Sequence, residues 1–353
     1  MDGSTARLAA SPLAPSAVSR WSTARFITCR RPRTDVYLLE LAGNDDAFAL
    51  REAESRGSAV EALAPGLATA RGVRHPATLA HTRRVCRLVG TCGPTVEDAV
   101  ALFSAATVDR SGSVAVRARD VRGLSGVDTR AAERRLGAVL VDRGFTVDLE
   151  DPDHTLVALF SEAAALGWLE TETDRGFGAR RPTEKPFFQP GSMDPADARA
   201  LANVAGAGPG ARLLDPMCGT GGVLVEAGLV GSDVVGLDAQ AKMVGGARKN
   251  LAHYLEDGFA VARGDATRLP FADDSFDGVV FDAPYGRQSK IEGDSLAALV
   301  GDALAEARRV GSRAVVVGDR PWVDAAGAAG WTVGARFDRR VHGSLTRVVH
   351  VLS

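Results

Sequence analysis

Residues 211–230 read ARLLDPMCGTGGVLVEAGLV, and this stretch decides how the C-terminal half of the chain is expected to fold. Its apolar start predicts a buried strand, and its apolar end predicts a helix. The three glycines between them let the backbone turn sharply and approach a ligand closely. The pattern therefore predicts a strand–loop–helix unit whose helix N–H groups point toward a bound group.

The same alternation of strand and helix continues to the C-terminus. It predicts a mostly parallel sheet with helices on both faces, so the expected fold class is α/β. The last two apolar segments, WTVGARFD and LTRVVHVL, predict an antiparallel hairpin turned at residues 342–344. The other strands are expected at residues 233–238, 259–265, 276–282 and 313–319, and the helices at 240–255 and 295–310.

Four of the predicted strands end in a carboxylate, at Asp215, Asp238, Asp265 and Asp282. Ligands of such sheets bind at the carboxyl ends of the strands. Asp238 is placed to accept hydrogen bonds from ribose hydroxyls, and Asp265 from the exocyclic amine of adenine. Asp215 lies inside the glycine-rich loop, where it suits a positively charged group such as an ammonium rather than a pyrophosphate. These residues together predict an adenosine-containing ligand.

The fourth of these strands ends in FDAPYG, residues 281–286. A plain turn needs no aromatic residue, so the tyrosine suggests contact with a substrate. The alternative is a strand-ending turn with an incidental tyrosine, and the motif alone leaves it open.

Length and composition indicate a globular protein of more than one domain. The chain has 353 residues, of which 45% are hydrophobic and 24% charged. No run of 18 apolar residues occurs, so no membrane span is expected. The four cysteines are scattered, which predicts reduced thiols in a cytoplasmic protein and no metal site.

The charge is unevenly distributed along the chain. Residues 71–150 contain 13 arginines and no lysine against nine acidic residues, whereas the whole chain has a net charge of −2. A basic block in an acidic protein suggests a polyanionic partner, although an ordinary solvated face would look the same. Within this block we expect an α+β region at residues 36–165. Its arginines are expected to face a phosphate backbone, from a strand (Arg117, Arg119) and from a helix (Arg130, Arg134, Arg135).

Two further segments complete the expected organisation. Residues 166–189 are rich in glycine, proline and charge and predict a linker before a second domain at 190–353. Residues 1–35 are rich in Ala, Ser, Pro and Arg with little periodicity. They could be a disordered, transit-peptide-like extension, or translation could begin near Val36; we favour the second hypothesis.

Residues 190–353 resemble a class I (Rossmann-like) S-adenosylmethionine-dependent methyltransferase. DPMCGTGG resembles its glycine-rich loop, GLDAQ its ribose-binding turn, GDATRLPF its adenine-contacting turn, and DAPYG the Asp/Asn-Pro-Pro-Tyr/Phe motif of amino-methylating members. From Val36 on, including KPFFQPGSM, the chain is similar to the archaeal tRNA guanine-10 N2-methyltransferases. Those carry an N-terminal ferredoxin-like segment and a THUMP RNA-binding domain.

The resemblance implies methyl transfer from S-adenosylmethionine to the exocyclic N2 of guanine 10 in tRNA, once or twice. In that mechanism Asp282 and the Ala283 carbonyl accept the two amine N–H groups, Pro284 holds the turn, and Tyr285 stacks on the flipped base. The family usually has proline where this chain has Ala283, which keeps the carbonyl but loses rigidity. The cofactor contacts that the resemblance implies are Asp215, Pro216, Gly219, Thr220, Gly221, Asp238, Ala239, Asp265 and Ala266.

Three alternatives stay open at this point. The same catalytic motif serves guanine-N2 methylation of ribosomal RNA and adenine-N6 methylation of DNA. The chain could also be an RNA-binding protein whose methyltransferase fold is inactive, although the four intact carboxylates argue against that. The expected partner is tRNA, with neither a membrane nor a metal ion, and a monomer is expected.

Overall fold

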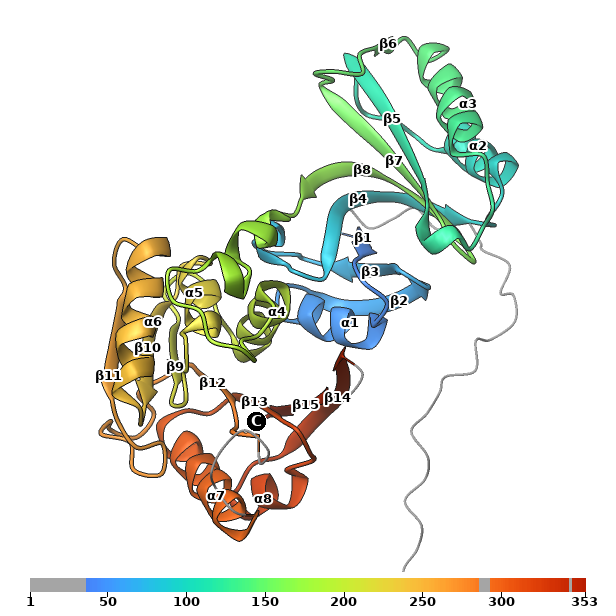
Figure 1. The fold of residues 1–353 in the computed structure, drawn as a ribbon. Coiled ribbons are helices and arrows are strands. Elements are labelled where there is room, and N and C mark those ends of the chain that lie inside the picture. The colour runs from blue at the N-terminus through green and yellow to red at the C-terminus, as the bar shows by residue number, and fades with distance from the viewer. Residues whose placement is uncertain (1–35, 286–292, 343–344) are drawn as a thin grey trace, which may run out of the picture. The chain divides into compact units, whose positions relative to one another are not determined.

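The computed structural model of the chain describes residues 36–285, 293–342 and 345–353 (Figure 1). The expectations for residues 1–35, for Gly286 and for the hairpin turn at 343–344 lie outside these residues. Within them, the strands form two sheets, one from each half of the sequence.

The first sheet has eight strands among the described residues, in the order β2-β3-β1-β4-β8-β7-β5-β6. Helices α2 and α3 pack on one face of β5 and β7, and α1 packs against β1 and β3. The elements are β1 (Val36–Leu41), α1 (Asp46–Glu54), β2 (Ser58–Ala64), β3 (Leu67–Arg71), η1 (Pro76–Thr78), β4 (Thr82–Cys92), α2 (Val96–Ala105), β5 (Ser113–Asp120), η2 (Val121–Gly123), α3 (Thr129–Val141), β6 (Thr146–Val147), β7 (His154–Phe160) and β8 (Ala164–Glu172).

Strand β8 extends this sheet into the segment expected to be a linker. It pairs with β4 and β7 along most of its length, up to the pair of Arg84 with Glu172. The short helices η3 (Gly176–Arg180) and η4 (Pro182–Glu184) follow it. The boundary proposed at residue 165 therefore lies inside the strand, and the division of the chain into domains stays a prediction.

The second sheet has seven strands in the described part of the chain, in the order β11-β10-β9-β12-β13-β15-β14. The first five are parallel, and β15 and β14 form the antiparallel hairpin expected from the sequence. Its elements are α4 (Pro195–Ala205), β9 (Arg212–Asp215), α5 (Gly222–Gly228), β10 (Asp233–Asp238), α6 (Ala241–Tyr254), β11 (Phe259–Arg263), β12 (Gly278–Asp282), α7 (Gly293–Val310), β13 (Ala314–Gly318), α8 (Val323–Ala328), β14 (Val333–His342) and β15 (Leu345–Leu352).

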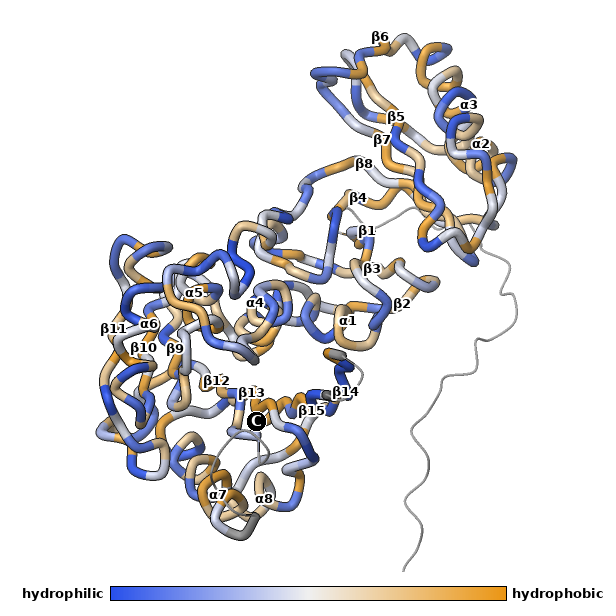
Figure 2. The backbone as a smooth tube through the Cα atoms, viewed as in Figure 1, coloured by the Kyte–Doolittle hydropathy of each residue, from blue (hydrophilic) through white to orange (hydrophobic). Residues whose placement is uncertain are grey.

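Helices cover both faces of this second sheet, as the sequence predicts. Helices α4, α5 and α6 share one apolar cluster with the sheet, while α7 and α8 share the other. Strand β13, which is apolar in the colours of Figure 2, is buried at every residue, and β12 is buried at every residue but its last. This burial is why these strands read as continuous apolar runs rather than as alternating ones.

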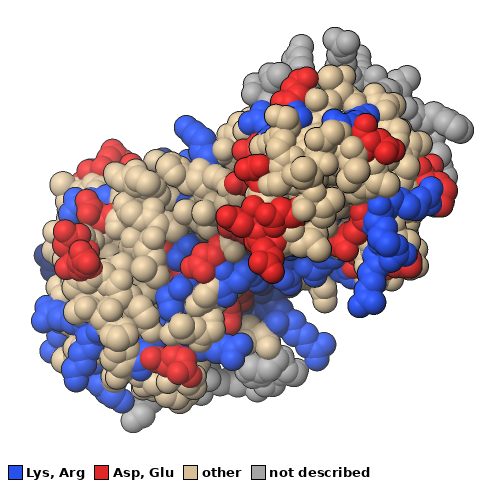
Figure 3. Space-filling model, turned by 90° about the horizontal axis from the view of Figure 1, so that it is seen from above, with Lys and Arg blue, Asp and Glu red and all other residues tan. Residues whose placement is uncertain are grey.

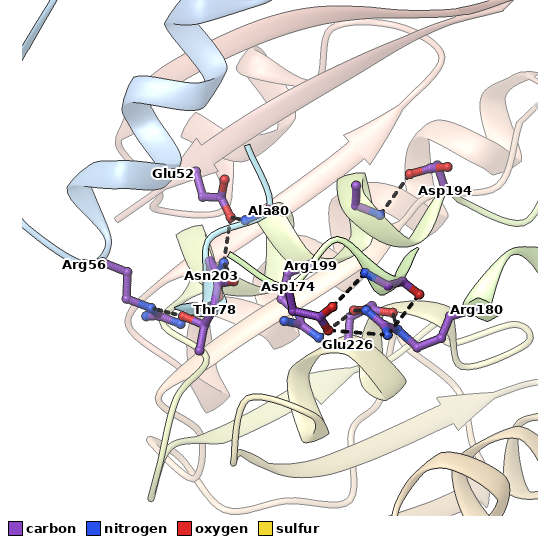
Figure 4. A network of polar contacts seen from close by, with 12 residues as sticks. Glu52, Arg56, Thr78, Ala80, Asp174, Arg180, Asp194, Arg199, Asn203 and Glu226 are labelled. Carbon is purple, nitrogen blue, oxygen red and sulfur yellow. Dashed lines mark hydrogen bonds and ion pairs between the residues drawn. The ribbon is translucent and has the colours of Figure 1, made fainter. Parts of the chain in front are cut away.

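Helix α4, which the sequence analysis did not predict, connects the two sheets. Asp194 caps its first turn, Pro195 begins it, and Gly206 ends it with a positive φ of 103°. It packs against the second sheet and also contacts α1. Its Asn203 donates to Glu52 of α1 at 2.6 Å and accepts a hydrogen bond from Arg56 at 2.6 Å (Figure 4).

The described residues contain neither a membrane-spanning helix nor a cluster of metal-binding side chains. None of their helices has both the length and the apolar character that crossing a membrane would need. No cluster of three or more His, Cys, Asp or Glu side chains is arranged to hold a metal ion in the part of the chain that the structure describes.

Candidate active site

The four carboxylates singled out in the sequence lie along one edge of the second sheet. Strands β11, β10, β9 and β12 are neighbours in that order, and Asp215, Asp238 and Asp282 are the last residues of their strands. Asp265 follows β11 by two residues. The charges of Asp238 and Asp282 both raise the pKa of Asp215, after the larger effect of burial, so these three groups lie within electrostatic range.

The loop after β9 has the backbone that its glycines predict. Gly219 and Gly221 have positive φ angles of 51° and 75°, a conformation that strains other residues. The Gly221 N–H donates to the Cys218 carbonyl at 2.7 Å, which closes a tight turn before α5. The Gly219 N–H donates to Asp238 Oδ2 at 3.0 Å, so the loop is joined to the end of β10.

Asp215 is the buried carboxylate of this edge. It is only 3% exposed, and its Oδ1 accepts one hydrogen bond, from the Met217 N–H at 3.0 Å. Burial raises the pKa of Asp215 well above its usual range. Within the described residues, no lysine or arginine forms an ion pair with it. A cationic ligand group at this position would remove the cost of burying the charge.

Asp238 and Asp265 differ from Asp215 in their surroundings. Asp238 uses both oxygens for backbone donors, since Oδ1 also accepts from the Gln240 N–H at 2.8 Å. Asp265 is exposed, and its Oδ1 accepts hydrogen bonds from the backbone and hydroxyl of Thr267. These two bonds lower the pKa of Asp265. Of their neighbours, Ala239 is exposed and Ala266 is buried.

The Asp-Ala-Pro-Tyr turn follows β12 directly. The Ala283 N–H donates to the Val317 carbonyl at 2.8 Å, so the start of the turn is held by the neighbouring strand β13. Tyr285 is half-buried, and its hydroxyl donates to Asp282 Oδ1 at 2.6 Å. The carboxylate is therefore oriented by the tyrosine of its own motif.

Arg347 of β15 completes this cluster and was not singled out in the sequence. Its Nε donates to the Tyr285 hydroxyl at 2.9 Å, and its Nη2 lies 3.6 Å from Asp282 Oδ2. A sequence signal exists, because Arg347 is the only charge in the apolar strand LTRVVHVL. A lone charge in a buried strand indicates that a partner is near.

Residues 185–193 border the glycine-rich loop. The side chain of Asn250 on α6 holds this segment, since it accepts from the Phe187 N–H at 2.8 Å and donates to the Phe187 carbonyl at 2.9 Å. The same amide donates to the Thr220 carbonyl in the loop at 2.9 Å. The hydroxyls of Ser192 and Thr220 lie 3.2 Å apart. The segment and the loop are thereby fixed to each other.

The five arginines proposed for RNA binding do not form one patch. Arg117 and Arg119 alternate with Val116 and Ala118, which pack under α2 and α3, so the two arginines face away from those helices. Arg119 pairs with the buried Glu40 at 2.7 Å. Arg130, Arg134 and Arg135 are exposed on α3, where Arg135 pairs with Glu97. On the face seen in Figure 3, basic and acidic side chains are interspersed.

A second buried network joins α4 to α5. Glu226 on α5 is fully buried and accepts from Arg180 Nε at 2.8 Å and from Arg199 Nη2 of α4 at 2.7 Å (Figure 4). Two guanidinium groups offset the cost of burying one carboxylate, and removing either partner would leave a buried charge unpaired. The network anchors the helix that follows the glycine-rich loop.

Known proteins match this chain over most of its length. The tRNA (guanine(10)-N2)-dimethyltransferase of Methanothermobacter thermautotrophicus is 38% identical over 248 residues, which cover 68% of this chain and 73% of that protein. The enzyme of the same name from Pyrococcus abyssi is 31% identical over 253 residues, with coverages of 68% and 74%. The chain belongs to the family of the archaeal tRNA (guanine(10)-N2)-dimethyltransferases.

Three further similarities extend over part or most of the chain. The family described as "RMKL-like, methyltransferase domain" matches residues 182–348. The mouse U6 snRNA (guanine-N(2))-methyltransferase THUMPD2 is 30% identical over 168 residues, which cover 46% of this chain and 30% of that protein. The crystal structure of TrmN from Thermus thermophilus has 24% identity and a TM-score of 0.48, and covers 90% of this chain and 99% of that chain.

Membership of this family makes the chain a class I methyltransferase with S-adenosylmethionine as its methyl donor. The described residues fit that donor, because a buried carboxylate without a cationic partner lies beside a tight glycine-rich turn. The strand order and the terminal hairpin agree with the expected fold.

Proposed function

We propose that this protein methylates the exocyclic N2 of guanine 10 in tRNA, once or twice. The observation that carries the proposal is the position of the Asp282–Tyr285 turn. It ends β12, the strand next to β9, so it lies beside the loop assigned to the methyl donor. The archaeal relatives of this family are named for that reaction.

The chemistry requires positioning of a weak nucleophile. The lone pair of the guanine N2 is delocalised into the ring, so hydrogen bonds that pull on its N–H groups help the nitrogen to pyramidalise. We assign those acceptors to Asp282 and to the Ala283 carbonyl. Tyr285 would stack on the base, an interaction worth about 1–3 kcal/mol. S-adenosylmethionine supplies an already activated methyl group when bound, so the protein has to align the two reactants.

We assign the donor to the loop and to the three neighbouring strand ends. Asp215 would face the ammonium of the donor, Asp238 its ribose and Asp265 its adenine. Backbone groups of the glycine-rich loop and the two turns would make the remaining contacts to the donor. The residues concerned are Pro216, Gly219, Thr220, Gly221, Ala239 and Ala266.

The N-terminal half is proposed to hold the RNA. We infer a ferredoxin-like and THUMP region between Val36 and the end of β8, with its arginines at the phosphates. The protein is proposed to act in the cytoplasm as a monomer. Another structured RNA is the second candidate substrate, favoured by the similarity to the mouse U6 snRNA methyltransferase.

Mass spectrometry of nucleosides tests the proposal directly. Unmodified tRNA transcripts would be incubated with the protein and isotopically labelled S-adenosylmethionine, and the modified position would be mapped. We expect labelled N2-methylguanosine at position 10, and its absence from a transcript with adenosine there. Label only on adenine, or only on U6-like RNA, would overturn the assignment.

Replacement of Asp282 tests the catalytic turn. Asp282→Asn should lower the methylation rate at least about 100-fold, because a neutral amide is a poorer acceptor for the amine. Cofactor affinity, measured by calorimetric titration, should change by no more than a few-fold. Asp302→Asn, at an exposed position of α7, is the matched control. A near-normal rate in Asp282→Asn would remove the proposed role.

A further inference from the structure

Arg347 occupies a special place in the second sheet. Strand β15 runs antiparallel to β13, and its Val348 pairs with Gly318, the last residue of β13. The residue before Val348 therefore lies at the carboxyl edge of the parallel strands, where the catalytic turn also lies. Arg347 is only 5% exposed there. The terminal hairpin thus brings a buried positive charge to the candidate active site.

The Arg347 guanidinium is itself held in place. Its Nη2 donates to the Gly191 carbonyl at 3.0 Å, in the segment that borders the glycine-rich loop. Its Nε donates to the Tyr285 hydroxyl at 2.9 Å. With two hydrogen bonds in different directions, the planar group has one orientation.

The Tyr285 hydroxyl relays this orientation to Asp282. The oxygen accepts from Arg347, so its own proton is directed to Asp282 Oδ1, 2.6 Å away. The ring plane of the tyrosine is then fixed by a bond on each side of its hydroxyl. Asp282 Oδ1 accepts this bond, whereas Oδ2 lies 3.6 Å from Arg347 Nη2 in an ion pair and accepts no hydrogen bond that joins two described residues. Oδ2 is therefore the oxygen left to receive an N–H group from a substrate.

We propose that Arg347 is the positioning residue of the methyl-acceptor site: through Tyr285 it presents Asp282 Oδ2 to the guanine amine. The inference rests on the proposed guanine-N2 methylation. It requires no contact between Arg347 and the base. Both hydrogen bonds are donated toward the carboxylate: Arg347 donates to the Tyr285 hydroxyl, and that hydroxyl donates to Asp282.

The pH profile separates this role from simple packing. Burial raises the pKa of Asp282, the charge of Arg347 and the hydrogen bond from Tyr285 lower it, and the charge of Asp319 raises it further. Asp282 must be ionised to accept the amine, so the loss of the arginine charge should move the acidic limb of kcat to higher pH. A residue that only packed would lower activity equally at every pH.

The experiment compares four variants and one control variant in the full chain. Arg347→Gln should lower kcat about 10- to 100-fold near neutral pH, shift the acidic limb upward, and leave the KM for both substrates within a few-fold. Arg347→Lys keeps a charge and should restore the limb without restoring the full rate. Tyr285→Phe breaks the relay, and the Tyr285→Phe/Arg347→Gln double variant should be no slower than the slower single variant. Arg336→Gln, an exposed change in the same hairpin, is the control.

The outcomes are distinct. If Arg347→Gln matches Arg336→Gln in rate and pH profile, the proposal is wrong. It is also wrong if the losses in the double variant simply multiply, because the two residues would then act separately. Should Arg347→Gln not fold, Arg347→Lys and Tyr285→Phe still decide between these results. Wild-type protein that methylates no guanine would instead refute the proposed function, whatever the variants do.

Discussion

At the residue scale, one residue type takes different roles according to its surroundings. Asp215 ends β9 and Asp265 follows β11, at the same edge of the second sheet. Burial raises the pKa of Asp215, whereas hydrogen bonds from Thr267 lower the pKa of the exposed Asp265. Burial of the ionised Asp215 therefore lowers the stability of the folded state, and a bound cation would offset that loss.

This contrast gives a prediction for Asp215→Asn. Because burial raises its pKa, Asp215 favours the folded state only when protonated, and this contribution is lost as the pH rises through the folded pKa. The asparagine variant should therefore be more stable than wild type at pH 8, by about 1–3 kcal/mol, with a smaller difference in acid. Its affinity for S-adenosylmethionine should fall. Denaturant unfolding at the two pH values and calorimetric titration measure both effects; a variant less stable at pH 8 would contradict this reasoning.

The members of the candidate site that could be predicted from the sequence are those that end apolar strands. Asp215, Asp238 and Asp282 end apolar strands, so strand periodicity alone places them at one edge. Arg347 was missed because its partners are remote: Tyr285 lies 62 residues earlier and Gly191 lies 156 residues earlier. Only the pairing of β15 with β13 brings them together.

At the scale of elements, the strongly apolar segments were predicted well. The parallel strands and the terminal hairpin agree with their sequence patterns. The hairpin of β2 and β3 was missed, because its alanine-rich sequence has little intrinsic preference for strands and is held by its pairing with β1. Helix α4 was also missed, although its Asp-Pro start and glycine end are clear signals.

The fixation of residues 185–193 by α6 leads to a second prediction. Asn250→Ala removes one acceptor and two donated hydrogen bonds at a fully buried position. Leaving these backbone groups unpaired should cost about 2–3 kcal/mol of unfolding free energy. The glycine-rich loop should also bind S-adenosylmethionine more weakly, since Thr220 loses its support. Lys249→Ala, at the exposed neighbouring position, should change neither quantity; equal effects of the two changes would argue against this role of Asn250.

At the scale of the whole molecule, composition indicated the kind of partner but not the surface that meets it. The basic excess of residues 71–150 is a property of the sequence. In the structure, part of that charge is used internally, since Arg84 and Arg119 pair with Glu40, and Arg122 pairs with Asp46. A count of charges cannot separate these structural arginines from the ones available to RNA, because the difference arises from tertiary packing.

The last prediction concerns the arginines of α3 and the whole RNA complex. Arg130 and Arg134 are exposed and form no ion pair within the described residues, whereas Arg135 is already paired with Glu97. Each phosphate contact releases condensed counterions, so losing one should reduce the slope of log K against log salt by about 0.7–0.9. The double variant Arg130→Gln/Arg134→Gln should therefore weaken tRNA binding and flatten its salt dependence, while Arg135→Gln should do so less. Binding titrations over a series of salt concentrations measure the slopes.

The double variant could instead keep the wild-type slope. In that case α3 does not contact the phosphates, and the opposite face of the first sheet, with Arg117, becomes the better candidate.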